Sequence, residues 1–201
     1  MTMEEYRNKK LELYRKLSER ENLFMDNACN NELCSKCKGA CCRNFPCSFS
    51  PDDFVDINDI EYMKSILDSG YFIISAFFIY ESPSRYELVY YIRCRGLMDD
   101  NTIVSTRSPY ENECIFHNEK GCSLDFYSRP SEGALLIPSE RRYGLGVCEN
   151  SYDYKKQIED WRKCRSIMNT LIDYYKDNES NNKKVDNINI YRLKKKLRKS
   201  E

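Results

Sequence analysis

The chain has 201 residues, which is enough to bury one hydrophobic core without disulfide support, so we expect a single domain. Its 32 basic and 32 acidic residues cancel to a formal net charge of zero, and this balance argues against a nucleic-acid-binding protein. No signal peptide is recognisable, and the longest apolar run, Tyr71 to Tyr80, is too short to span a membrane, so we predict a cytoplasmic protein.

Helical spacing of apolar residues predicts an N-terminal helix over residues 3–24, and a polar loop then leads to the densest cysteine cluster. In this cluster, Cys34-Ser-Lys-Cys37-Lys-Gly-Ala-Cys41-Cys42, four thiols lie within nine residues. Cytoplasmic thiols stay reduced, and the total of eleven cysteines is odd, so the cluster indicates metal ligands or redox thiols rather than disulfides. Thiolates bind zinc and iron–sulfur clusters strongly, and two cysteines separated by two residues can both reach one ion.

The residues between these thiols favour an irregular turn organised by a metal. Gly39 and Ala40 are small and allow the backbone to reverse tightly. Basic neighbours should lower the thiol pKa values and favour the ligand form. These neighbours are Lys36, Lys38 and Arg43. The two adjacent cysteines at the end of the motif are harder to seat on one ion, which leaves room for a second site.

The segment after the first cluster contains two possible helix starts. Ser50-Pro51-Asp52-Asp53 combines a capping serine, a proline suited to the first helical position and two acids that suit the helix dipole. Asn58-Asp59-Ile60-Glu61 is the second start, and Gly70 marks the end. One helix, or a short turn followed by a helix, would both fit this pattern.

Aromatic and β-branched residues in Tyr71–Tyr80 and Tyr86–Cys94 predict a hairpin. The first run is apolar on both faces, which favours a covered central strand. A third, short strand is expected at residues 102–106, and apolar residues at helical spacing predict a helix over residues 152–176.

Together these elements predict an α+β fold, in which a small and mainly antiparallel sheet is flanked by helices and joined to a cysteine-rich loop region. We assign residues 1–182 to one cysteine-rich metal-binding domain and residues 183–201 to a basic C-terminal tail.

A second cluster also combines closely spaced ligand residues with a glycine at a turn. Its sequence is Cys114-Ile-Phe-His117-Asn-Glu-Lys-Gly121-Cys122. A cysteine and a histidine separated by two residues can chelate one ion, and the glycine lets the chain turn before the last cysteine. We expect the two clusters to lie together in the fold.

The two clusters together resemble the CxxCxxCC family, also called YkgJ-like, of zinc- or iron-chelating proteins. The matching residues are Cys34, Cys37, Cys41, Cys42, Cys114, Phe116, Gly121, Cys122, Leu124, Tyr127, Arg129 and Pro130. Ser50-Pro51-Asp52-Asp53 also looks like the helix start that follows the first cluster in this family. The resemblance covers about half of the chain, and it implies that these cysteines bind a metal ion or an iron–sulfur cluster.

The chain departs from the family pattern at two positions. The family usually has a further cysteine three residues after the Arg-Pro pair, where this chain has Gly133, and we expect Cys148 to replace it as a ligand. An open coordination position is the alternative. His117 falls where the family usually has an apolar residue, so we favour a loop histidine over a ligand. Arg129 could bind the negative charge of a cluster or cap a carboxylate.

The predicted metal ligands are Cys34, Cys37, Cys41, Cys42, Cys114, Cys122 and Cys148. These thiols exceed the four ligands of one zinc ion, so a [4Fe–4S] cluster with spare thiols, or two metal sites, would use them better. We interpret Cys29, Cys94 and Cys164 as core or surface thiols, while Cys47 is close enough to the first cluster to join it.

Three functions stay open for such a protein. Some relatives in the family are implicated in flagellin lysine N-methylation, so the resemblance makes an enzyme acting on a protein or peptide conceivable. A zinc-stabilised module that binds a protein partner, and a metal carrier or redox sensor without catalysis, are the alternatives. No catalytic constellation stands out, so the sequence supports a cofactor site better than a particular reaction.

Overall fold

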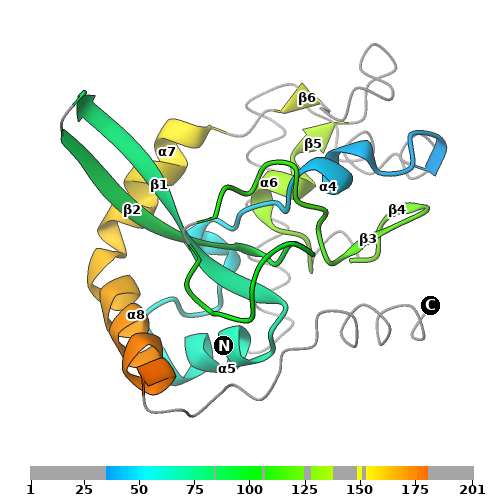
Figure 1. The fold of residues 1–201 in the computed structure, drawn as a ribbon. Helices are drawn as coiled ribbons and strands as arrows, with labels where there is room; N and C mark the ends of the chain where they lie inside the picture. The colour runs from blue at the N-terminus through cyan, green and yellow to red at the C-terminus, as the bar shows by residue number, and fades with distance from the viewer. Residues whose placement is uncertain are drawn as a thin grey trace.

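Two long antiparallel strands, β1 (Phe72–Ser82) and β2 (Arg85–Cys94), form the central hairpin of this computed structural model (Figure 1). The structure describes residues 35–83, 85–105, 107–124, 128–137, 149–150 and 153–180. β-Branched and aromatic residues dominate both strands and favour extended backbone. The register pairs Phe72 with Cys94, and the hairpin predicted from the sequence is confirmed.

The fold is α+β, as predicted, because helices surround small antiparallel sheets. Two further strand pairs contain only two residues per strand. One joins β3 (His117–Asn118) to β4 (Gly121–Cys122), and the other joins β5 (Leu136–Ile137) to β6 (Glu149–Asn150). Figure 1 shows α7 and α8 along one side of the hairpin and the short elements α4, β3 and β4 on the opposite side.

The segment after the first cysteine cluster forms a short turn and then a separate helix. The turn is η1 (Pro51–Asp53), a 3-10 helix with a capping box in which the Ser50 N–H donates to the Asp53 carboxylate at 2.9 Å. The helix is α5 (Ile60–Asp68), whose first turn is capped by the Asp59 side chain. Both predicted helix starts are therefore used, and they belong to different elements.

Two helices replace the single helix expected over residues 152–176. They are α7 (Tyr154–Lys163) and α8 (Arg165–Ser180), and α7 ends at Cys164, where the backbone leaves the helical region. Both helices pack against β2. Asp153 caps α7 by accepting hydrogen bonds from two N–H groups of its first turn.

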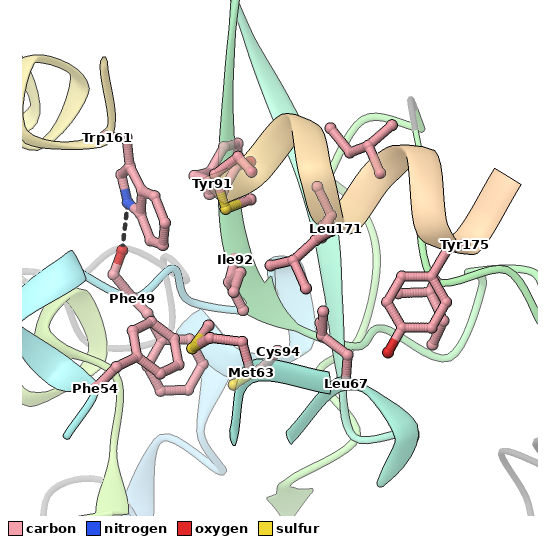
Figure 2. Close-up of a cluster of buried hydrophobic side chains, with 14 of the residues drawn as sticks. Phe49, Phe54, Met63, Leu67, Tyr91, Ile92, Cys94, Trp161, Leu171 and Tyr175 are labelled. Atoms are coloured by element: carbon pink, nitrogen blue, oxygen red, sulfur yellow. Dashed lines mark hydrogen bonds between the residues drawn. The ribbon is translucent and has the colours of Figure 1, made fainter. Parts of the chain in front are cut away.

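The hydrophobic core lies between the hairpin, α5 and the two C-terminal helices (Figure 2). Trp161 is buried, and its Nε1–H donates to the carbonyl of Phe49 at 2.8 Å. Phe54 packs edge-on against the same indole, with 6.2 Å between ring centroids. Met63 and Leu67 of α5 are fully buried in the same core. In the helix predicted over residues 152–176, Trp161, Met168, Ile172 and Tyr175 are buried, so its apolar face belongs mostly to the core.

β1 is not the centre of a wider sheet in the described part of the chain, contrary to expectation. Besides β2, its one partner there is Val104, which forms a single parallel bridge with Ile74. The strand expected at residues 102–106 is therefore reduced to this single bridge. Ile74 is fully buried, whereas Tyr80 near the hairpin tip is 70% exposed, so only the base of β1 is covered.

Several predictions fall outside the described residues. These are the helix over 3–24, the tail over 183–201 and the boundary that separates the tail from residues 1–182. Within the described ranges, no helix combines the length and apolar character that a membrane crossing requires.

Candidate metal centre

The first cysteine motif forms a tight turn followed by a short helix, α4 (Ala40–Asn44). Lys38 and Gly39 both adopt left-handed backbone, with φ of 53° and 57°, so the chain reverses just before the helix. Cys41 and Cys42 therefore lie on a helical turn. The small residues allow the tight reversal that the sequence predicts, but regular helix replaces part of the expected irregular loop.

The second motif lies directly against the first. Gly121, with φ of 114°, turns the chain into β4. The N–H of Cys114 donates to the carbonyl of Cys42 at 2.7 Å. A Cβ atom on Gly39 would come within 2.8 Å of the Gly121 Cα, so two glycines allow this approach. The expectation that the two clusters come together is confirmed for these residues.

A buried ion pair fixes the loop that carries the second motif. Arg93 Nη1 and Nη2 lie 2.8 and 2.9 Å from the two Asp99 carboxylate oxygens, and both side chains are fully buried. Asp99 also accepts hydrogen bonds from the Gly96 N–H and the Asn112 side chain. The Asn112 N–H in turn donates to the carbonyl of Asn44 in α4 at 3.2 Å. This network connects the loop before Cys114 to the first motif.

Three thiols from the two motifs are in contact, and we call Cys41, Cys42 and Cys122 the cysteine trio. The Cys42 side chain hydrogen-bonds with Cys122 and with Cys41. The hydrogen bond from Cys42, helped by the charge of Arg129, lowers the pKa of Cys122 to about 7. The same hydrogen bonds hold the pKa of Cys42 well above its ordinary value. Cys122 is therefore more readily a thiolate than Cys42.

The prediction that basic neighbours lower the thiol pKa is wrong for Cys42. The strongest influences on its pKa are the other thiols of the trio and its burial, and all of them raise it. Arg43 instead directs its guanidinium to the carbonyl of Cys37 at 3.4 Å, and Lys36 and Lys38 are exposed. The lowered pKa occurs in the second motif, where Arg129 contributes.

Two further thiols, Cys94 and Cys114, form a buried pair joined by a side-chain hydrogen bond. Burial above all, and then this hydrogen bond, raises the pKa of Cys94 well above its ordinary value. Cys47 adjoins both groups, because its carbonyl accepts the Cys94 N–H at 3.0 Å and its side chain packs with Cys41 and Leu136. Cys114 thus lies beside a thiol that the sequence analysis assigned to the core.

His117 joins the two motifs through both nitrogens of its ring. Its Nε2 lies 2.8 Å from the Lys38 carbonyl, and its Nδ1 lies 3.2 Å from Glu113 Oε1. Both ring nitrogens therefore face oxygen atoms of the protein. His117 belongs to the short strand β3 rather than to a loop, and its ring holds the turn at Lys38 against the second motif.

Arg129 is half-buried, and its Nε donates to the carbonyl of Leu124 at 3.1 Å. Its charge acts favourably on the Cys122 thiolate. This position agrees with a partner for negative charge at the cysteine trio.

Not every predicted ligand can be placed. Cys34 and Cys148 lie outside the described residues, so the expected contact of Cys148 with a metal stays a prediction. Cys37 is partly exposed on the turn before α4. Among the described residues, no group of three or more His, Cys, Asp or Glu side chains is arranged so that it could hold a metal ion. Within the trio, Cys42 instead hydrogen-bonds with each of the other two thiols.

Two neighbouring thiols were not assigned as ligands from the sequence. For Cys47, the signal in the sequence was its position close after the first motif. Cys94 is brought to Cys114 by the register of the hairpin, in which it pairs with Phe72, and by the bridge between Gly96 and Cys114. No local sequence pattern predicts the contact between Cys94 and Cys114.

A scan against models of protein families, a search of curated proteins and a search of solved structures each give no match for this chain. The resemblance to the CxxCxxCC family therefore rests on the residues of the two motifs.

Proposed function

We propose that the chain is a cytoplasmic metalloprotein whose two cysteine motifs together hold an iron–sulfur cluster or zinc. The observation that carries this proposal is the contact between Cys42 of the first motif and Cys122 of the second, two thiols that are distant in sequence. In a reducing compartment such contacts are more useful as a ligand set than as a disulfide.

Cys42 and Cys122 would supply the first ligands, and the remaining candidates named by the sequence are Cys34, Cys37, Cys41, Cys114 and Cys148. A thiol binds a metal only after it loses its proton. Cys122 does so more readily than Cys42, because its pKa is lowered to about 7. The pKa of Cys42 is raised by its thiol neighbours, and a bound cation would counter that effect.

The elements that carry these thiols also suit a metal-stabilised region. α4 has five residues, and β3 and β4 have two residues each. Elements of this length are not stable by themselves. Zinc would supply a crosslink between the motifs, and an iron–sulfur cluster would add electron-transfer chemistry. We favour a [4Fe–4S] cluster, since the chain offers more cysteines than one zinc ion uses.

The test is the metal and sulfide content of protein purified without oxygen. We expect iron with acid-labile sulfide, or zinc, at one or more equivalents per chain, and Cys122→Ser should remove most of it. Cys164→Ser is the matched control, because Cys164 is also partly exposed and the charged groups acting on it are Asp160, Asp52 and Lys163 rather than cysteines. Folded wild-type protein free of metal would contradict the proposal.

A redox sensor is the second candidate, favoured by the direct contact of Cys42 with Cys122 and by the lowered pKa of Cys122. Glutathione disulfide would accept two electrons as the two thiols lose two protons and form one disulfide. In metal-free protein, mass spectrometry should then find this disulfide, and dithiothreitol should reverse it. An unreacted pair after exposure to glutathione disulfide would exclude the sensor.

The biological use of the centre is a separate part of the proposal. We propose a protein or peptide as the partner, either as the substrate of a modifying enzyme or as the ligand of a zinc-stabilised module. Pull-down with metal-loaded protein, using Cys122→Ser as the control, tests whether binding needs the intact centre.

A further inference from the structure

The outer half of the central hairpin carries aromatic side chains that the core does not cover. Residues that pair across an antiparallel hairpin point their side chains to the same face. Three successive pairs near the tip therefore share one face, and we call these six residues the aromatic face. They are Ala76 with Tyr90, Phe78 with Leu88, and Tyr80 with Tyr86.

The opposite face of the same stretch is the one that the C-terminal helices cover. Phe77 and Ile79 on this opposite face pack against the hydrophobic core. Glu87, which pairs with Ile79, forms ion pairs with Arg162 of α7 and Arg165 of α8. The aromatic face thus points away from these helices, and Figure 1 shows the tip of the hairpin extending away from α4, β3 and β4.

Three rings of the aromatic face are exposed and lie together. Phe78 is 44% exposed, Tyr86 is 56% exposed and Tyr80 is 70% exposed. The Tyr86 ring is next to both others, with its centroid 5.8 Å from that of Phe78 and 6.2 Å from that of Tyr80. Their exposed parts amount to about 350 Å² if a whole aromatic side chain is taken as about 200 Å². A contiguous apolar patch of this size is typical of an interaction site, whereas single exposed rings are ordinary.

The edge of β1 beside these rings offers backbone groups for pairing. The N–H of Ile74 donates to the Ile103 carbonyl at 2.8 Å, and the Ile74 carbonyl accepts the Ser105 N–H at 2.9 Å. Both groups of Ile74 therefore point away from β2, and in an antiparallel strand every second residue does the same. The residues that continue this pattern toward the tip are Ala76, Phe78 and Tyr80. Within the described part of the chain, no backbone group pairs with them on this edge.

We propose that the hairpin tip binds a protein partner by strand addition. An extended segment of the partner pairs with the outer edge of β1 and lays apolar side chains on the aromatic face. In this binding mode the backbone hydrogen bonds supply affinity and alternate side chains supply specificity. The segment is uncharged where it meets the aromatic face, because none of the six side chains there is charged. A charge buried against them would lose its water without gaining a counter-ion.

Two other occupants fit this surface less well. A second copy of the chain, packed face to face, would bury about 700 Å² of the three rings in total, which is below the roughly 1,000 Å² expected of a stable interface. A lipid membrane would take up the rings but would leave the backbone groups along the edge of β1 without hydrogen-bond partners. An added strand satisfies both the rings and the backbone.

The first experiment uses short random peptides displayed on phage and selected on the immobilised full chain. We expect the selected peptides to be uncharged, and fluorescent synthetic copies should bind the wild type in solution. Phe78→Thr and Tyr86→Thr should each weaken this binding at least about tenfold, because each removes a central aromatic anchor while threonine keeps the strand preference. Tyr110→Thr is the matched control, since Tyr110 is 75% exposed but lies outside the hairpin. Equal affinity for all four proteins, or no selected peptide at all, would overturn the inference.

Methylation of the peptide nitrogens tests the strand pairing without changing the protein. Only every second residue of an added strand turns its N–H toward the edge of β1. Methylating one alternating set of nitrogens should therefore abolish binding, whereas methylating the other set should leave most of it. Equal effects of the two sets would show that the peptide does not pair as a strand, and the inference would then be wrong.

This inference gives a location to the polypeptide partner of the proposed function and rests on that part of it, but it does not depend on the metal. Cys122→Ser should lose metal and still bind the peptide like the wild type. If the wild type holds metal but Phe78→Thr binds the peptide with full affinity, only the role of the aromatic face is wrong. If the wild type lacks metal but Phe78→Thr loses the peptide, only the metal centre is wrong. A wild-type dimer that Tyr86→Thr converts to a monomer in sedimentation would assign the face to a second copy and overturn the inference.

Discussion

The hydrophobic core and the cysteine region of this molecule are built in opposite ways. The core joins the long hairpin to α5, α7 and α8 through large buried side chains (Figure 2). The cysteine region consists of elements of two to five residues, namely α4, α6 (Ser131–Ala134) and the strands β3 to β6. Long elements can bury enough apolar surface to hold themselves together, whereas short ones depend on polar contacts, close glycine approaches and, as we propose, a metal.

The largest effect is expected from breaking the core at Trp161. Trp161→Ala removes a fully buried indole and its hydrogen bond to the Phe49 carbonyl, and it should lower the free energy of unfolding by about 3–5 kcal/mol. Urea unfolding of metal-free protein measures this loss. Tyr80→Ala is the control, since Tyr80 is 70% exposed and its replacement should cost less than about 0.5 kcal/mol. Equal costs for both variants would show that the core is not where we place it.

A slightly smaller loss is expected where the core supports the cysteine region. Asp99→Ala leaves the buried Arg93 guanidinium without its carboxylate partner and removes an acceptor for Gly96 and Asn112. We expect the free energy of unfolding to fall by about 3 kcal/mol. Because the network reaches α4, metal content should fall as well.

The control for that prediction is a surface ion pair. Glu61→Ala breaks the contact between Glu61 and Lys64, in which the Glu61 side chain is largely exposed, and should cost less than about 1 kcal/mol. If Asp99→Ala unfolds in urea like Glu61→Ala, the buried ion pair does not support this loop.

The sequence predicted the core better than the cysteine region, for a physical reason. The hairpin and α5 carry local signals: two runs rich in aromatic and β-branched residues, a capping aspartate at 59 and a glycine at 70. The α+β class followed from these. The break between α7 and α8 at Cys164 carries no such signal, because apolar residues continue at helical spacing through it. Both helices pack against β2, so the break coincides with tertiary packing rather than with a local sequence preference.

For the site, the motifs predicted which segments meet but not which thiols touch. The contact between the first motif and Cys122 was expected from their chemistry. The pairing of Cys114 with Cys94 depends on strand register, and the side chain of Cys47 lies against Gly133 of α6, so neither follows from spacing along the chain. The pKa expectation for Cys42 was wrong for a similar reason, since thiol neighbours distant in sequence outweigh adjacent charges.

A moderate effect confined to the cysteine region is expected from Gly39→Ala. Gly39 has φ of 57°, and a Cβ atom there would lie 2.8 Å from Gly121 and 2.9 Å from the His117 ring. The left-handed backbone alone should cost about 1–2 kcal/mol, and the clash should separate the two motifs. We expect metal content to fall by more than half while far-ultraviolet circular dichroism barely changes.

Gly70→Ala is the matched control for that variant. Gly70 also has a left-handed backbone, with φ of 78°, but it lies at the end of α5. It should cost similar stability and leave the metal content intact. Equal metal loss in the two variants would mean that backbone strain, rather than contact between the motifs, determines metal binding.

The smallest effect concerns the protonation of Cys122 in metal-free protein. Its pKa is lowered to about 7, first by the hydrogen bond from Cys42 and then with help from Arg129. Because the folded pKa lies below the ordinary one, the thiolate contributes stability at high pH, and this contribution disappears as the pH falls through about 7.

The rate of alkylation of Cys122 by iodoacetamide should therefore rise with a midpoint near pH 7. Arg129→Gln should move this midpoint upward, because it removes a favourable charge. Cys164 provides the internal comparison, since burial raises its pKa and its reaction should begin only at higher pH. The two midpoints are measured together by mass spectrometry of the labelled peptides, and a Cys122 midpoint at or above that of Cys164 would contradict the proposed thiolate.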